Sequence, residues 1–229
     1  MDAASKKLIR AIRNAKCAQI DLGGALASNR TAVLRRAARL ILSRKNLILA
    51  ENKKDIAGAS QSRAFMDRLM LNPDRIEKMA GAVSAVAAQD DPVGQVVVSR
   101  RRPNGLRVDK VRVPLGVVAI IYESRPNVTA DAAALALRAG NAIVLRTGRE
   151  AIRSSRCIAG CFNDALTMEN LSPDSVLFVN SPDRNLVKTL LSAEGLVDVA
   201  IPRGGPGLIE EVVRSAKIPV IKHYLGVCH

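Results

Sequence analysis

The sequence contains few aromatic residues and few histidines, and both shortages narrow the possible functions. Aromatic side chains make up 2% of the 229 residues, tryptophan is absent, and there are two histidines. A protein that binds single-stranded nucleic acid by base stacking needs several aromatic side chains, so this function is not favoured. The hydrophobic core must consist mainly of Ala, Val, Leu and Ile, and a hydrophobic content of 48% is enough to form one.

The sequence also lacks an apolar run long enough to cross a membrane, which takes about 20 consecutive residues. Its N-terminus is basic and amphipathic, with Lys and Arg spread among the apolar residues, which is not typical of a secretory signal. A weak likeness to an organelle transit peptide is opposed by Asp2, by Asp21 and by the scarcity of serine. With only four cysteines and no secretory signal, we expect free thiols and a cytoplasmic protein.

Positive charge is abundant but unevenly distributed. The net charge is +14, and residues 1–113 contain 23 Lys and Arg against 10 Asp and Glu. Residues 114–229 contain 12 against 11. A solvated basic face is the first interpretation of this asymmetry, and an anionic partner is the second. Nucleic acid is the less favoured partner, because no binding motif accompanies the charge.

Short apolar runs alternate with amphipathic stretches from residue 117 onward. Val117–Tyr122 is typical of a buried strand, residues 128–139 of a helix that ends at Gly140, and residues 142–146 of a second strand. A strand, a helix and a strand within about 30 residues form a βαβ unit with parallel strands. The alternation continues with helices at 151–166, 184–192 and 208–215 and strands at 176–179, 197–201 and 219–222. The sequence therefore predicts an α/β protein with a doubly wound, Rossmann-type parallel sheet of five strands.

Helices and a hairpin precede this sheet. Apolar residues recur at helical spacing through residues 3–88, with a helix start at Asn72-Pro73-Asp74. Residues 95–102 and 106–113 resemble two strands joined at Pro103-Asn104-Gly105. We therefore divide the chain into an N-terminal helical part (1–92), a β-hairpin arm (93–113) and the Rossmann-type core (114–229).

Two loops at strand ends are candidate ligand sites. Residues 203–207 join a strand to a helix, where bare N–H groups and the helix dipole favour a phosphate. A glycine-rich turn without a ligand is at least as common. Asn127 follows the first strand of the sheet, and either it or Thr129 could instead cap the next helix.

Several long motifs in this order resemble the γ-glutamyl phosphate reductases (glutamate-5-semialdehyde dehydrogenases) of the aldehyde dehydrogenase superfamily. The motifs are NGLRVDKVRVPLG (104–116), PLGVVAIIYESRPNVTADAAALALRAGNAIVLRTGREA (114–151), VDVAIPRGGPGLIE (197–210) and IPVIKHYLGVCH (218–229). The first 60 or so residues match by helical character more than by motif. This resemblance implies NADPH-dependent reduction of γ-glutamyl phosphate to glutamate 5-semialdehyde and phosphate, a step of proline biosynthesis.

The resemblance also implies roles for individual residues near the sheet. Arg146 and Glu150 would bind the adenine ribose of NADP(H), although Glu150 could instead only complement its helix N-terminus. Gly204 and Gly205 would lie beside the pyrophosphate of the dinucleotide. Arg149 departs from the small residue expected at its position, and it could strengthen or crowd the binding of the 2′-phosphate.

Substrate contacts and a partner are implied in the same way. Asn127 would donate to the oxyanion of the reaction intermediate. Ser124 and Arg125 would contact the acyl phosphate, since a guanidinium binds phosphate through two parallel bonds; loop packing is the alternative for Arg125. The hairpin would contact another subunit of a homo-oligomer, and a plain surface ribbon is the alternative.

The nucleophilic cysteine of this family belongs to a motif beyond His229, so the resemblance implies the cofactor-binding half without the catalytic domain. Cys228 lies near His223 and His229, but its motif matches a family segment upstream of the nucleophile, so Cys228 is not expected to replace it. The spacing of His223, Cys228 and His229 fits no standard metal site. Cys157 and Cys161, four residues apart, are expected to be small buried hydrophobic residues. A non-enzymatic basic remnant, binding nucleic acid or pairing with another subunit, is the alternative function.

Overall fold

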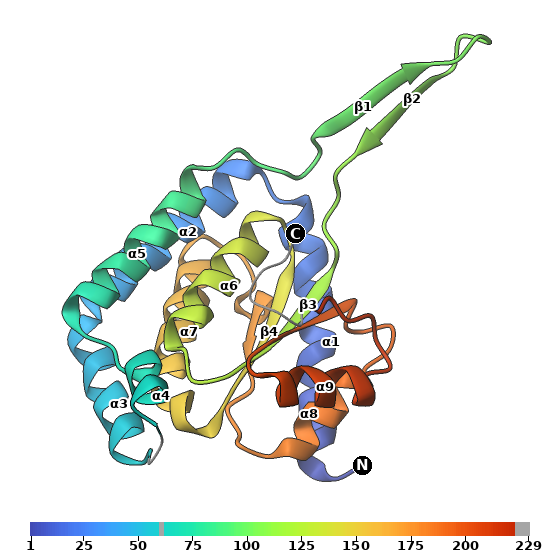
Figure 1. The fold of residues 1–229 in the computed structure, drawn as a ribbon. Helices are drawn as coiled ribbons and strands as arrows, with labels where there is room; N and C mark the ends of the chain where they lie inside the picture. Colours follow the sequence, from blue (N-terminus) through green and yellow to red (C-terminus); the bar gives the residue numbers. More distant parts are fainter. Residues whose placement is uncertain (60–61, 223–229) are drawn as a thin grey trace.

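The structure is a computed structural model that describes residues 1–59 and 62–222 of the chain. Five helices come first, followed by a long hairpin and then by alternating strands and helices (Figure 1). The helices are α1 (Ala3–Gly24), α2 (Ala27–Ser43), α3 (Lys45–Ala57), α4 (Arg63–Leu69), α5 (Pro73–Ala88), α6 (Pro126–Arg138), α7 (Ile152–Met168), α8 (Arg184–Leu191) and α9 (Pro206–Ser215), with 3-10 turns η1 (Arg149–Ala151) and η2 (Pro173–Ser175). The strands are β1 (Val96–Arg101), β2 (Arg107–Val111), β3 (Val117–Tyr122), β4 (Ala142–Thr147), β5 (Val176–Phe178) and β6 (Val199–Arg203).

The central sheet is parallel, with the strand order β5-β4-β3-β6. This arrangement confirms the predicted Rossmann-type fold. The prediction of five strands is wrong for the described residues, because the predicted strand at 219–222 makes a single bridge, between Val220 and Ala200.

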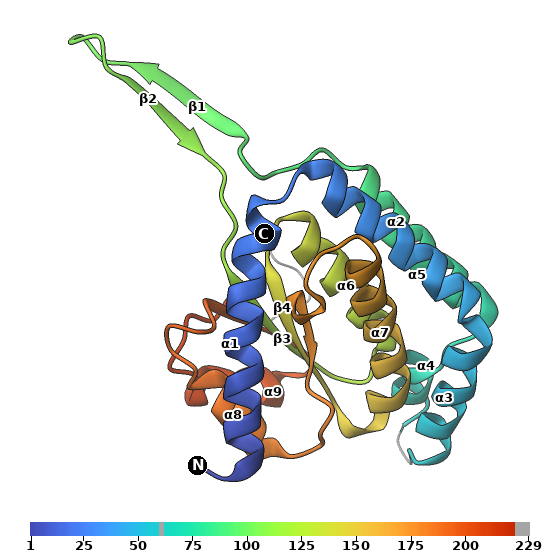
Figure 2. The same cartoon turned by 180° about the vertical axis from the view of Figure 1, so that it is seen from behind.

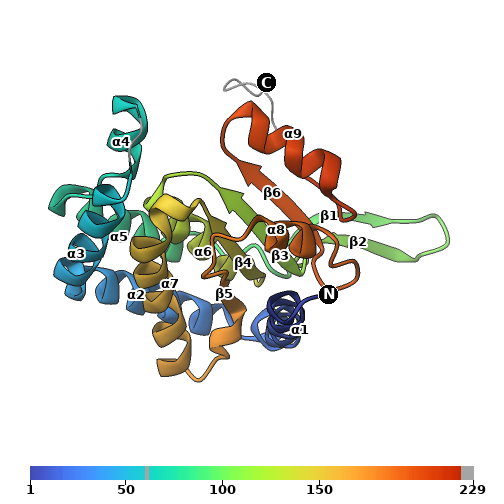
Figure 3. The same ribbon diagram turned by 90° about the horizontal axis from the view of Figure 1, so that it is seen from below.

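Alternate side chains of the strands enter two separate hydrophobic cores. In β4, Ile143 and Leu145 pack with α2, α5, α6 and α7, whereas Ala142 and Val144 pack with α1 and α8. Because successive side chains of a strand point to opposite faces, a run that is apolar throughout requires helices on both faces. Figures 2 and 3 show these two groups of helices on opposite sides of the sheet. This confirms the buried strands predicted from the apolar runs.

Helix α6 begins earlier than the sequence suggested. It starts at Pro126, and its N-cap residue is Arg125, which makes no side-chain capping bond. The prediction that Asn127 or Thr129 caps this helix is therefore wrong. The physical reason is Pro126, whose fixed φ and missing N–H suit the first helical position. Asn127 consequently lies inside the first turn.

Hairpin β1–β2 is antiparallel and leaves the body of the protein as a narrow ribbon (Figures 1 and 2). Every residue of both strands is exposed, including the valines. At its base two buried arginines tie the chain together. Arg30 donates to Leu22 O, to Ala25 O and to Asp91, and Arg138 donates to Gln89 O and Thr31. These bonds hold the segment after α5, from which the hairpin starts, against α2 and α6. No described helix has the length and apolar character needed to cross a bilayer.

Candidate functional site

The order in which strands are added to the parallel sheet changes sides at β3. Strands β4 and β5 follow on one side of β3, whereas β6 pairs with its other side. In open parallel sheets, ligands bind outside the carboxyl ends of the strands at such a switch point. Here these ends carry residues 123–125 after β3 and residues 203–205 at the end of β6. The topology therefore selects the same loops as the sequence motifs.

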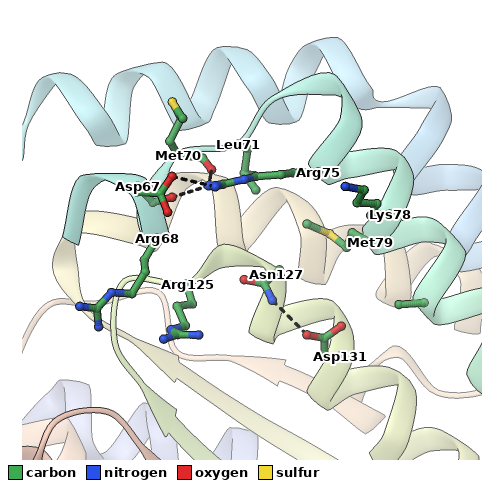
Figure 4. Close-up of a pocket in the computed structure, with 11 residues that line it drawn as sticks. Asp67, Arg68, Met70, Leu71, Arg75, Lys78, Met79, Arg125, Asn127 and Asp131 are labelled. Carbon is green, nitrogen blue, oxygen red and sulfur yellow. Dashed lines mark hydrogen bonds and ion pairs between the residues drawn. The ribbon is translucent and has the colours of Figure 1, made fainter. Parts of the chain in front are cut away.

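Two adjoining clefts lie at this edge of the sheet and share Arg68 and Arg125. One cleft has a volume of about 280 Å³ and is lined by Phe65, Arg68, Glu123, Ser124, Arg125, Arg203, Gly204 and Gly205. The other has a volume of about 380 Å³ and lies between α4, α5 and the start of α6 (Figure 4). Its lining includes Asp67, Arg75, Lys78, Met79, Asn127 and Asp131. The two clefts therefore lie between the carboxyl end of the sheet and the N-terminal helices α4 and α5.

A carboxylate of the chain itself lies at the N-terminus of α9. The N–H of Gly205 donates to Glu123 Oε2 over 3.0 Å, in the place where a helix favours an anion. A Cβ on Gly204 would approach both Glu123 Oε2 and Leu208 Cδ2 to 2.7 Å, whereas one on Gly205 would lie 3.9 Å from its nearest neighbour. A side chain at Gly204 would displace the ends of the Glu123 and Leu208 side chains, whereas a Cβ at Gly205 would make only an ordinary contact.

Ser124 connects the end of β3 to the segment after β4. Its φ is +43°, which is uncommon for a residue other than glycine, and its Oγ donates to Glu150 Oε1 over 2.8 Å. Strained backbone of this kind often occurs at functional sites. Ser124, for which the resemblance implies a substrate contact, is therefore bonded to Glu150, for which it implies a cofactor contact.

Arg146 lies near the end of β4 and is partly buried. Its Nη2 donates to Pro182 O over 3.2 Å, while its Nε is buried and has no hydrogen-bond partner within the described residues. Burial lowers the pKa of Arg146, and nearby Arg184 lowers it further, against the opposite effect of Glu150. A guanidinium stays charged at neutral pH. The buried Nε is out of reach of a ligand, whereas the Nη groups on the exposed side of this cation are the donors that an anion such as a phosphate could contact.

Asn127 and Arg125 border the clefts from the start of α6. The side chain of Asn127 is exposed, and its Nδ2 donates to Asp131 Oδ2 over 3.1 Å (Figure 4). Burial raises the pKa of Asp131, against the lowering effects of Asn127 and Arg203. The pKa of Arg125 is lowered by burial first and then by the positive charges of Arg68 and Arg203.

The described cysteines do not form a reactive or metal-binding group. Burial raises the pKa of Cys161 to about 11 and also raises that of Cys157. Cys161 is buried, as predicted, and Cys157 is only partly so, while Cys17 is exposed on α1. Across residues 1–59 and 62–222, no group of three potential metal ligands occurs. His223, Cys228 and His229 lie outside the described residues.

The structure gathers most of the predicted site residues at one edge of the sheet. Ser124, Arg125, Gly204 and Gly205 line the smaller cleft, and Asn127 lines the larger one. Glu150 joins this group through its bond to Ser124. Arg68 was missed by sequence reasoning, since it belongs to a short helix without a motif and reaches the cleft only through packing.

Comparison with known proteins gives consistent matches over nearly the whole chain. A family model described as "Aldehyde dehydrogenase family" matches residues 1–224. The γ-glutamyl phosphate reductase of Idiomarina loihiensis is 49% identical over 205 residues, which cover 88% of this chain and 49% of that protein. The corresponding protein of Anaeromyxobacter dehalogenans is 47% identical over 230 residues, covering 99% and 53%. The chain thus spans about half the length of the curated relatives it matches.

Solved structures give the same result. The γ-glutamyl phosphate reductase of Thermotoga maritima superimposes with a TM-score of 0.91 at 36% identity, covering 97% of this chain and 54% of that one. The Saccharomyces cerevisiae protein of the same description has a TM-score of 0.85 at 28% identity, covering 97% and 56%. An acetylating aldehyde dehydrogenase from Geobacillus thermoglucosidasius shares the fold, with a TM-score of 0.70 at 20% identity over 95% of this chain and 45% of that one.

Proposed function

This chain belongs to the aldehyde dehydrogenase family, and from that premise we propose that it provides the cofactor-binding part of a γ-glutamyl phosphate reductase. The reaction is the NADPH-dependent reduction of γ-glutamyl phosphate to glutamate 5-semialdehyde and phosphate, in proline biosynthesis. The similarity to reductases of this description in sequence and in structure supports the assignment. Unpaired thiols at the described cysteines are consistent with a reducing compartment, so we propose a cytoplasmic location.

The observation that carries the cofactor assignment is the state of Arg146. Its guanidinium is partly buried at the end of β4, its Nη2 donates to Pro182 O and Glu150 acts on its charge, while among the described residues its other Nη donors have no partner. A cation with free donors suits the 2′-phosphate of NADP(H), while a carboxylate suits the ribose hydroxyls. Gly204 and Gly205 would lie beside the pyrophosphate of the dinucleotide, as the family resemblance implies. When bound, NADPH supplies the hydride.

The other residues at this edge would act on the substrate. Asn127 would donate its second amide N–H to the oxyanion, because Asp131 engages only one of the two. Arg125 would hold the phosphoryl group. The reaction also requires a thiolate nucleophile. Cys157 and Cys161 do not suit this role, since burial raises their pKa.

The experiment is a fluorescence titration of the chain with NADPH and with NADH, repeated for Arg146→Gln. A hydrogen bond to a charged group contributes about 1.5–3 kcal/mol. We therefore expect the Kd for NADPH to increase roughly 10- to 150-fold in the variant. The Kd for NADH should change little, because NADH has no 2′-phosphate.

Arg184→Gln is the matched control, because Arg184 is an exposed neighbouring cation whose charge acts on Arg146. If Arg146 contributes only through the local electrostatic field, the two variants will weaken NADPH binding alike. That result, or an equal loss of affinity for NADPH and NADH, would refute the role of Arg146. A folded chain that binds neither dinucleotide would refute the proposed function.

We also propose that hairpin β1–β2 contacts a second copy of the chain. Its valines are exposed although they are apolar, with relative exposures of 51% for Val96 and 43% for Val111, which oppose each other in the ladder. Exposed apolar side chains on an isolated two-stranded ribbon are typical of an interaction surface. The assignment of the partner as a second copy follows the family resemblance.

Sedimentation of the protein with Val111→Asp tests this contact. A buried carboxylate in the interface would shift the oligomer toward monomers. Asn104→Asp adds the same charge at the turn of the hairpin, keeps the acceptor that Leu106 N uses and should leave the oligomeric state unchanged. An unchanged sedimentation coefficient for Val111→Asp would contradict the proposal.

A further inference from the structure

Three arginines from different parts of the chain meet at the smaller cleft. Arg68 comes from α4, Arg125 precedes α6, and Arg203 ends β6. All three line the same cavity of about 280 Å³. In Figure 4 the side chains of Arg68 and Arg125 extend toward the same side of the cleft. Their guanidinium groups act on one another electrostatically, since the charges of Arg68 and Arg203 both lower the pKa of Arg125.

Most hydrogen-bond donors of these arginines have no partner in the part of the chain that the structure describes. Arg68 uses its Nε on Ala64 O over 3.0 Å. Within the described residues, the guanidinium groups of Arg125 and Arg203 form neither a hydrogen bond nor an ion pair. Arg75, which lines the adjoining cleft, differs in this respect because it is engaged by Asp67 and by Met70 O.

Like charges brought together without partners destabilise one another unless an anion joins them. The cavity volume is close to the lower end of the roughly 300–1,000 Å³ typical of small-molecule sites. A tetrahedral phosphoryl group presents several oxygens, and guanidinium forks bind such oxygens through parallel bonds. Glu123 occupies the N–H of Gly205 on the other wall, so the cations are the available contacts for an anion.

We propose that Arg68, Arg125 and Arg203 together form a binding site for one phosphoryl dianion. Its occupants are the phosphoryl group of an acyl phosphate and the inorganic phosphate released from it. The identification of these occupants rests on the proposed function, in which Arg125 alone holds the phosphate. The new elements are Arg68, supplied by the N-terminal helices, and Arg203, supplied by β6.

Inorganic phosphate is the probe, titrated by calorimetry at constant ionic strength into the chain and into its Arg68→Gln and Arg203→Gln variants. We expect each variant to raise the Kd for phosphate about tenfold or more, which corresponds to about 1.4 kcal/mol. Arg68→Lys keeps the charge but loses the fork, so its Kd should lie between those of the wild type and Arg68→Gln.

Arg214→Gln is the control for net charge, because Arg214 is exposed on α9 and paired with Glu211. It should change the Kd for phosphate less than twofold. Thermal unfolding curves identify any variant that binds phosphate weakly because it is unfolded. If Arg68→Gln or Arg203→Gln is such a variant, the Kd for phosphate is measured on the corresponding lysine variant instead. Equal effects of Arg68→Gln and Arg214→Gln, or no phosphate binding by the wild type, would overturn the proposal.

A second titration separates the two possible sources of a phosphoryl group. With saturating NADPH present, phosphate should still bind, and Arg68→Gln should leave the Kd for NADPH unchanged. Displacement of phosphate by NADPH would instead assign the cluster to the cofactor pyrophosphate and overturn the substrate assignment. If Arg146→Gln leaves NADPH binding unaffected while Arg68→Gln abolishes phosphate binding, the cofactor assignment fails and the phosphoryl site stands.

Discussion

Asp55, on α3, binds the first turn of the neighbouring helix α7. We expect its replacement to lower the free energy of unfolding strongly. Its Oδ2 accepts from Ser154 N over 2.8 Å and from Ser154 Oγ over 2.6 Å, and its Oδ1 accepts from Arg153 N over 3.2 Å. Asp55 is 5% exposed. In Asp55→Ala these three donors lose their acceptor at a buried place, where each unsatisfied group costs about 1–3 kcal/mol.

We expect Asp55→Ala to lower the free energy of unfolding by about 3–5 kcal/mol, because water can reach part of the opened site. For a chain of this length, that is a decrease in Tm of roughly 6–20 °C. Asp55→Asn keeps one acceptor oxygen and should cost about 1–2 kcal/mol. The assay is thermal unfolding followed by far-UV circular dichroism.

Asp183→Ala is the matched control, since Asp183 caps α8 through an exposed bond to Asn185 N over 2.8 Å. Loss of such a cap costs about 1 kcal/mol, or roughly 2–4 °C in Tm. If Asp55→Ala lowers Tm no more than Asp183→Ala does, the reasoning from buried donors is refuted.

Three further predictions concern the backbone, the thiols and the buried tyrosine. Gly116→Ala should lower Tm more than Gly195→Ala, because both glycines have positive φ but only a Cβ on Gly116 would overlap with the Asp198 carboxylate; equal losses in calorimetry would contradict this. Iodoacetamide at pH 8 should label exposed Cys17 well before Cys161, whose pKa burial raises to about 11, as mass spectrometry of the peptides can measure. Burial raises the pKa of Tyr122 to about 12. Neutral Tyr122 therefore stabilises the folded state below about pH 10, and this contribution is lost as the pH rises from about 10 to 12. In Tyr122→Phe, the free energy of unfolding measured with denaturant should no longer show this decrease.

The sheet could be predicted from the sequence because its strands are short apolar runs with polar boundaries. Val117–Tyr122 has the same bounds in the prediction and in the structure. The parallel arrangement was expected from the intervening helix, since parallel neighbours need a crossover of about this length and a strand-helix-strand run of this kind is typical of a βαβ unit. The start of α6 was placed too late because Asn127 and Thr129 were weighed as caps, whereas Pro126 at the first helical position decided the boundary.

The contacts that define the candidate site could not be predicted in the same way. The bond from Ser124 to Glu150 and the bond from Gly205 to Glu123 join residues of different loops. Local patterns place each residue at the end of a strand, but they do not specify which side chains meet across the gap. Arg68 shows this most clearly, because only the packing of α4 brings it to Arg125.

Part of the positive charge of the N-terminal half has a structural role in these contacts. Several of its cations dock the N-terminal helices onto acids of the second half, as in Lys16–Asp198 at 2.6 Å, Arg36–Glu169 at 2.5 Å and Arg44–Asp164 at 2.6 Å. Arg68 contributes instead to a cleft where it meets arginines of the second half. A surface for single-stranded nucleic acid combines a basic groove with aromatic side chains on which the bases stack. Among the described residues, Phe65 is the only aromatic residue that lines either of the two clefts. The described arginines at this edge of the sheet line a cleft of about 280 Å³, which is a size that suits the small anion proposed above.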